Sequence, residues 1–107
     1  MLDLSGAVKR YFSVKLPHGE VLELKPPKVK VLRRVTDVAD RFSEDSMERE
    51  ESFFKEFAEA VALILSSNKK GKKFDANYVE DNIELDAAIL LFEGYFKWVG
   101  EVQKDPN

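Results

Sequence analysis

The segment YFSVKLPHGEVLELKPP, Tyr11–Pro27, decides the fold class because its hydrophobic residues recur with the period of a β-strand. Hydrophobic and polar residues alternate on both sides of the central PHGE. Pro17 and Gly19 favour a tight turn between the two runs. The two prolines at the end of the segment stop the second run, since proline has no N–H to donate to a strand ladder. The segment therefore predicts a β-hairpin over residues 11–25.

The chain after the hairpin has the hydrophobic period of α-helices, with apolar residues every three or four positions. The predicted helices cover residues 28–42, 46–67, 75–82 and 85–103. A lone hairpin is marginally stable in water, so it should pack on these helices. We therefore expect an α+β, mainly α, fold in which an N-terminal β-hairpin packs on about four helices.

Capping residues mark two of the predicted helix starts. Asp45 or Ser46 can cap the second helix, and acidic residues crowd its first turn, where the helix dipole favours them. Asp75 suits the N-cap of the third helix, and Phe74 and Val79 have the spacing of a hydrophobic staple. These signals support helix boundaries near residues 46 and 75.

Length and composition indicate one folded domain, residues 1–107, with 44% hydrophobic and 35% charged residues. The chain has no cysteine, so disulfides and thiolate metal sites are excluded. No apolar run follows a basic start, and none reaches the roughly 20 residues of a membrane helix. We expect a cytosolic protein.

The net charge of −3 is unevenly distributed along the chain. Residues 1–36 are mainly basic, whereas residues 37–67 are mainly acidic. The simpler interpretation is that these segments attract each other within one molecule. The alternative is head-to-tail self-association or a charged partner.

Enzyme motifs are missing from the sequence: it has no glycine-rich phosphate loop, nucleophile elbow or HExxH zinc motif. The only histidine, His18, lies in the predicted hairpin turn. The pairs Glu56/Glu59 and Asp37/Asp40 have helical spacing but lie opposite the apolar faces, where solvated charge is usual. We expect no catalytic, metal or cofactor site.

The lysine cluster KKGKK, Lys69–Lys73, is the strongest indication of nucleic-acid binding. Four lysines could contact phosphates, and Tyr78 is near enough to stack on a base. The cluster has no arginine and no interleaved aromatic residue, and the whole chain is acidic. A solubilising loop is therefore the preferred interpretation, and nucleic-acid contact the alternative.

Two predicted helices carry wide apolar faces. The stretch Leu90–Gly100 places four aromatic residues within seven positions, and the apolar arc of that helix covers about half of the cylinder. The helix over residues 46–67 should bury Phe54 and Phe57, with Phe53 at the edge of its stripe. Either a central helix packs on both sides, or part of the apolar area meets another protein. The partner-binding candidates are Phe53, Phe54, Tyr95, Phe96 and Trp98.

The order of these segments resembles the small tail assembly chaperones of long-tailed bacteriophages, particularly those of phages and prophages of low-GC Gram-positive bacteria. The most characteristic portion is ILSSNKKGKKFDANYVEDN followed by the helix that contains YFKWV. The resemblance covers nearly the whole chain. It rests on a pattern of segments rather than on an active-site signature.

The resemblance implies a non-enzymatic protein in the cytoplasm of the infected or lysogenic bacterial host. Such chaperones bind the phage tape-measure protein and keep it soluble until tail-tube subunits polymerise round it. The implied partners are the tape-measure protein, the tail-tube protein as a further candidate, and other copies of the chain. Many members of the family also have a longer form made by ribosomal frameshifting.

Overall fold

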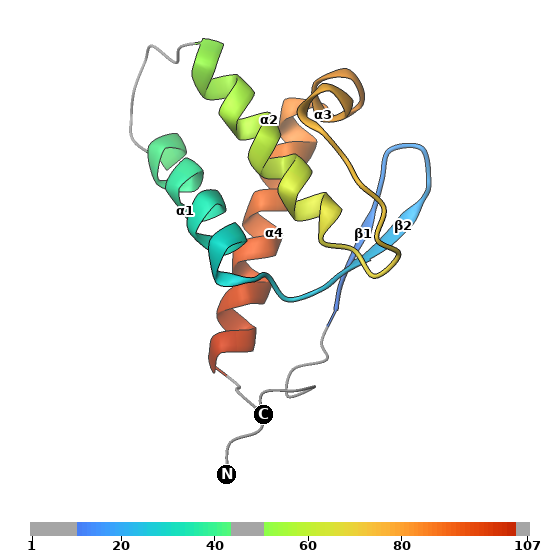
Figure 1. The fold of residues 1–107 in the computed structure, drawn as a ribbon, viewed down its shortest axis with the longest axis vertical. Helices are drawn as coiled ribbons and strands as arrows, with labels where there is room; N and C mark the ends of the chain where they lie inside the picture. The colour runs from blue at the N-terminus through green and yellow to red at the C-terminus, as the bar shows by residue number, and fades with distance from the viewer. Residues whose placement is uncertain (1–10, 44–50, 105–107) are drawn as a thin grey trace.

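The computed structural model describes residues 11–43 and 51–104, which form a two-stranded hairpin followed by four helices (Figure 1). The strands are β1 (Phe12–Lys15) and β2 (Val21–Leu24), and the helices are α1 (Val29–Ser43), α2 (Glu51–Ser66), α3 (Ala76–Asn82) and α4 (Leu85–Lys104). The expected fold class is confirmed. The proposed start of the second helix, with its caps at Asp45 or Ser46, lies outside the described residues.

The hairpin is antiparallel, with Phe12 opposite Leu24 and Lys15 opposite Val21. Gly19 closes the turn with a φ of 102°, a conformation that side chains with a Cβ rarely adopt. The alternation in the sequence becomes two faces, and Leu22 and Leu24 are fully buried against the helices. The hairpin is therefore held in place by the inward side chains of β2.

Helix α2 lies at the centre of the molecule, with α1, α3, α4 and β2 all in contact with it (Figure 1). Helix α1 lies along α2 and is joined to it through Arg34–Glu59 and Arg41–Glu56, and the C-terminal end of α2 reaches the hairpin (Figure 1). Its buried residues lie on several sides of the helix: Phe53, Phe57, Ala58, Ala60, Val61, Ala62, Ile64 and Leu65. A helix that is apolar around most of its surface requires such enclosure.

A continuous row of aromatic rings connects α2, α4 and β1. Phe57 of α2 contacts Phe92 of α4, with 4.9 Å between ring centroids. At the other end of the row, Trp98 stacks on Phe12 at 5.4 Å and an interplanar angle of 16°. The complete row is Phe54, Phe53, Phe57, Phe92, Phe96, Tyr95, Trp98 and Phe12. Five of these eight rings are buried, so the row belongs mainly to the core.

The hairpin packs against helix α4 at Gly94. A Cβ on Gly94 would lie 3.1 Å from Cζ of Phe12, closer than an ordinary van der Waals contact. Trp98 is one turn further along the same helix and stacks on the same ring. Gly94 thus gives the tip of the Phe12 ring room to approach α4.

The loop after α2 is organised by Asn68, which is 1% exposed. Its side-chain amide donates to the carbonyls of Leu65 (2.7 Å) and Lys72 (2.8 Å), and its Oδ1 accepts from the Lys72 N–H (3.0 Å). Its backbone forms a β-bridge with Leu24. On either side of the bridge, Lys25 donates to the Ser67 carbonyl and Lys69 to the Glu23 carbonyl. One buried side chain therefore fixes both the loop and its pairing with β2.

The start of α3 has the predicted cap, since the Asp75 side chain accepts a 2.8 Å hydrogen bond from the Tyr78 N–H. The expected burial of Phe54 is wrong, because this side chain is 40% exposed and Phe53 is buried instead. Phe53 stacks on Phe57, and the Arg41 guanidinium lies 5.8 Å from its ring centroid. Helix α2 is enclosed from more sides than a single apolar stripe assumes, so its inward face includes Phe53.

Replacing Gly94 should weaken the attachment of the hairpin. We expect Gly94→Val to lower the free energy of unfolding by about 1–3 kcal/mol, because the new side chain displaces the Phe12 ring. The control is Gly100→Val in the same helix, where no neighbour lies within 4 Å of the added Cβ. That variant should be neutral or slightly stabilised. Urea unfolding measures the free energy of unfolding of both variants. Equal losses of stability in the two variants would contradict the close approach of Phe12 to Gly94.

Removing the Asn68 side chain should lower the free energy of unfolding by more than the small size of the side chain suggests. Asn68→Ala leaves a backbone N–H and two carbonyls without their partners, so we expect the free energy of unfolding to fall by about 2–4 kcal/mol. Asn77→Ala, at an exposed position of α3, is the matched control and should be neutral or slightly stabilising. Thermal or urea unfolding measures the stability of both variants relative to the wild type. Similar stability of the two variants would show that the loop does not depend on Asn68.

Candidate functional site

The five partner-binding candidates are placed differently in the fold. Phe53, Tyr95 and Trp98 are buried, with exposed fractions of 8%, 1% and 9%. Phe96 is half-buried at the edge of the core, and Phe54 is exposed. All five lie on the one aromatic row, but only the last two can contact another protein without rearrangement of the core.

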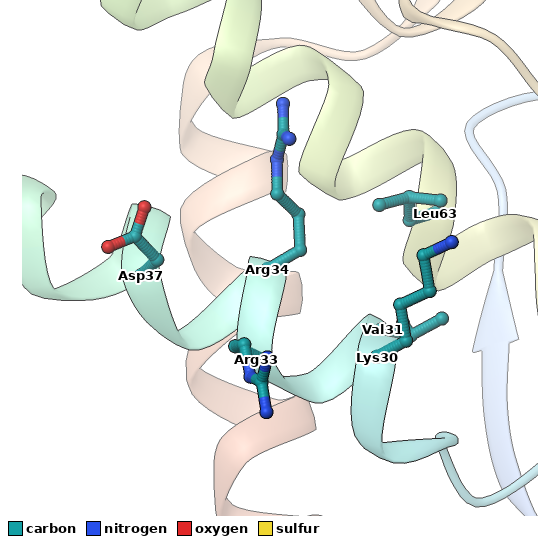
Figure 2. Close-up of a pocket in the computed structure, with 6 residues that line it drawn as sticks. All are labelled: Lys30, Val31, Arg33, Arg34, Asp37 and Leu63. Atoms are coloured by element: carbon teal, nitrogen blue, oxygen red, sulfur yellow. The ribbon is translucent and has the colours of Figure 1, made fainter.

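A hollow lies between α1 and α2 and has a volume of about 520 Å³. Val31 of α1 and Leu63 of α2 supply its apolar part, and Figure 2 shows Leu63 pointing back toward α1. We call it the α1–α2 hollow, and its lining residues are Lys30, Val31, Arg33, Arg34, Asp37 and Leu63. Leu63 is 37% exposed, so the hollow opens to the surface.

The rim of the α1–α2 hollow is mainly basic. Arg34 reaches toward α2 and donates to a Glu59 carboxylate oxygen at 3.0 Å (Figure 2). Within the described ranges, Lys30 and Arg33 have no hydrogen-bond or ion-pair partner. Their exposed charges are therefore available to a bound group, and Asp37 is the one acidic residue of the lining.

The surface remains hollowed from Leu63 toward the start of α3. A second depression of about 340 Å³ shares Arg34 and Leu63 with the first and continues to Phe74 and Ala76. The two depressions together follow the exposed side of α2. They offer a partner an apolar strip with charged edges.

The lysine-rich loop is largely engaged by the hairpin. Lys72 Nζ lies 2.6 Å from Glu20 Oε1, and this hydrogen bond is the main reason that the pKa of Glu20 is below its ordinary value. Lys69 lies 3.4 Å from a Glu23 oxygen and 4.5 Å from the ring centroid of Tyr11. Two of the four lysines thus neutralise hairpin carboxylates, which reduces the positive field that the loop can present to an anion.

His18 lies in the exposed hairpin turn, and its Nε2 is 3.3 Å from Glu20 Oε1. In the described part of the chain, no three histidine, aspartate or glutamate residues gather closely enough to hold a metal ion. Across residues 11–43 and 51–104, no helix combines the length and apolar content needed to cross a bilayer.

Sequence reasoning did not identify the α1–α2 hollow. The helical period places Leu63 on the polar side of α2 with Glu56 and Glu59, and this position was the available signal. Lys30 and Arg33 belong to the basic segment at residues 1–36, but nothing in the sequence shows that α1 brings them beside Leu63. Their proximity depends on how α1 and α2 pack.

Comparison with known proteins gives no relative for this chain. No protein-family model matches it, and neither a curated protein nor a solved structure does.

The buried state of Tyr95 can be tested through its hydroxyl group. The side chain is enclosed, its hydroxyl has no hydrogen-bond partner among the described residues, and burial raises the pKa of Tyr95 to about 12. The phenol therefore ionises in the unfolded chain, near pH 10, before it ionises in the folded one. Stability is fully present below pH 10 and should fall as the pH rises from 10 to 12.

We expect Tyr95→Phe to be as stable as the wild type at pH 7, or more stable by up to about 1 kcal/mol, because no hydrogen bond is lost. Its advantage should grow between pH 10 and 12. Urea unfolding at several pH values measures this difference. A constant difference across that interval would show that the hydroxyl reaches solvent.

Proposed function

We propose that this protein is a tail assembly chaperone of a long-tailed bacteriophage that binds the tape-measure protein during tail morphogenesis. It acts without catalysis, in the cytoplasm of the bacterial host, and the tail-tube protein is a further candidate partner. The resemblance of nearly the whole chain to these chaperones supports the proposal. So does the surface of the described residues, which offers apolar and charged area that includes exposed Phe54.

The observation that carries the proposal is the way in which the aromatic row reaches the surface at Phe54. The exposed ring packs edge-on against buried Phe53, with 5.6 Å between centroids, and Phe53 stacks on Phe57. An aromatic side chain held by a rigid core loses little conformational entropy on binding. Such a residue is suited to anchor an apolar face of a helical client.

Phe96 is the second candidate contact, at the edge of the core on α4. Its ring packs edge-on against Phe92 and Tyr95, at 5.9 and 5.7 Å between centroids. The two accessible rings, Phe54 and Phe96, are then held in a fixed orientation by the buried part of the row, which includes Phe53, Tyr95 and Trp98. The same core that stabilises the fold would thereby preorganise the client-binding surface.

Nucleic-acid binding is less well supported by the geometry. The Lys69–Lys73 loop shares its charge with Glu20 and Glu23 of the hairpin. Tyr78 does not present its whole ring to solvent, because it is half-buried and packs against Phe74 at 5.0 Å between centroids. Both features oppose the phosphate-and-stacking arrangement that single-stranded nucleic acids require.

Co-expression with the tape-measure protein of the same phage genome tests the proposal. The wild-type chain should move most of that protein into the soluble fraction, whereas Phe54→Ser should reduce the rescued amount several-fold. Tyr11→Ser is the matched control, since Tyr11 is 41% exposed but lies beside the hairpin, and it should rescue as the wild type does. The folded state of each variant is checked by circular dichroism.

Two results would contradict the proposal. One is a tape-measure protein that stays insoluble with every form of the chain. The other is retention of the wild-type chain on immobilised DNA that disappears as salt rises, which would favour the nucleic-acid alternative.

A further inference from the structure

The basic rim of the α1–α2 hollow is not explained by the stability of α1. Lys30 and Arg33 are exposed near the start of this helix, and its first turn contains no acidic residue. The helix dipole places partial positive charge at this end, so it disfavours a lysine there. Neither side chain has an ion-pair partner among the described residues. Their charges are therefore available to an anion from outside the chain.

The α1–α2 hollow also has an apolar lining, which a compact anion such as phosphate would leave uncovered. Val31 and Leu63 supply this lining, and Leu63 is 37% exposed, so its apolar surface is open to a ligand. The long stems of Lys30 and Arg34 add aliphatic area around the two side chains. The volume of about 520 Å³ is in the range typical of small-molecule sites. The hollow therefore suits a ligand that has both an apolar part and a negative charge.

The character of the surface changes from the α1–α2 hollow to the second depression. The hollow is mainly basic, and Arg34 at the junction is already paired with Glu59 at 3.0 Å. Beyond this ion pair the second depression is mainly apolar, and its other lining residues are Ala62, Leu63, Phe74, Asp75 and Ala76. Asp75 is engaged as the N-cap of α3. An anionic head with one aliphatic chain matches this sequence of surfaces better than a molecule that is charged along its length.

We propose that the α1–α2 hollow binds a free single-chain amphiphile with an anionic head, such as a fatty-acid carboxylate. The head accepts hydrogen bonds from Lys30 and Arg33, which are the stronger, charge-assisted kind. The chain lies over Leu63 and enters the second depression toward Ala76, where each covered methylene adds to the affinity. Phe54 is not among the lining residues of either depression, so the inference does not rest on the proposed function.

Isothermal titration calorimetry with decanoate, at low salt and below its micelle-forming concentration, tests the proposal. Decanoate should bind at one site per chain. Its affinity should exceed that of uncharged decan-1-ol and that of inorganic phosphate by at least about tenfold, because each of these probes lacks one half of the recognised structure. Raising the salt concentration should weaken the binding of decanoate, since its head is held by exposed cations.

Substitutions test the two kinds of contact separately. Lys30→Glu with Arg33→Glu should weaken the binding of decanoate at least about tenfold, because carboxylates then face the head. The matched control is Lys97→Glu, an exposed charge reversal on α4, which should bind as the wild type does. Leu63→Ser should also weaken binding, whereas Leu90→Ser, at a position of α4 that is 70% exposed, should not. Circular dichroism checks that each variant is folded.

The length of the ligand tests the path of its chain. Decanoate should bind more tightly than hexanoate, since more of its chain is covered. Ala76→Glu places a carboxylate in the second depression and at the first residue of α3, where the helix dipole favours it. This variant should therefore fold normally but lose most of the difference in affinity between the two probes. An unchanged preference for decanoate would overturn the proposed path.

Three results would overturn the proposal as a whole. The first is a wild-type chain that binds no decanoate below the micelle-forming concentration. The second is inorganic phosphate or decan-1-ol that binds as tightly as decanoate, which would indicate a plain anion site or unspecific apolar contact. The third is co-sedimentation with phosphatidylglycerol vesicles without binding of free decanoate, which would assign the basic rim to a membrane surface. These measurements involve no tape-measure protein, so their outcome is separate from that of the proposed function.

Discussion

The enclosure of α2 is the constraint on which the rest of the structure depends. Of the fourteen α2 residues whose burial the structure describes, residues 53–66, eight are buried, and they lie on several sides of the helix. Water must therefore be excluded from several sides of the helix at once, and no single neighbour can do this. Helices α1, α3 and α4 and strand β2 each cover a different side (Figure 1). The positions of the hairpin and of the loop at Asn68 follow from the need to close the C-terminal end of this helix.

The sequence predicts the elements of this fold because their hydrophobic periods are strong. The alternation around Gly19 specifies the hairpin, and Asp75 specifies the start of α3, since both depend on neighbouring residues alone. The orientation of α2 was predicted less well. Phe53 and Phe54 are adjacent and chemically identical, and their burial depends on where α1 and α4 lie, which a helical wheel does not contain.

Asn68 illustrates the same limit for polar residues. In the sequence it is one asparagine beside a lysine cluster, and nothing nearby shows that it is buried. Its role depends on Leu24, which is distant along the chain but bridged to it in the fold. The α1–α2 hollow is a similar case. Its residues are visible in the sequence, but their proximity on the molecular surface follows from tertiary packing.

The surface charges are of two kinds: some form ion pairs between α1 and α2, and others lie at helix ends where the helix dipole disfavours them. Arg34–Glu59 and Arg41–Glu56 join α1 to α2 at exposed positions, so each contributes at most about 1 kcal/mol to stability. Other charges have no ion-pair partner among the described residues and act against their own helix dipoles, at the start of α1 (Lys28 and Lys30) and at the end of α3 (Glu80 and Asp81). Charge that weakens the isolated molecule is the kind that assembly with another molecule can compensate.

The bridge between Leu24 and Asn68 has a consequence for the order in which the chain can fold on the ribosome. Synthesis from the N-terminus releases both strands first, at roughly 5–20 residues per second. The hydrogen-bonding edge of β2 finds its partner only after residue 69 has emerged, and Phe12 finds Gly94 and Trp98 later still. For several seconds the nascent hairpin therefore has an unpaired edge and uncovered leucines, which are the features that neighbouring nascent chains can pair with.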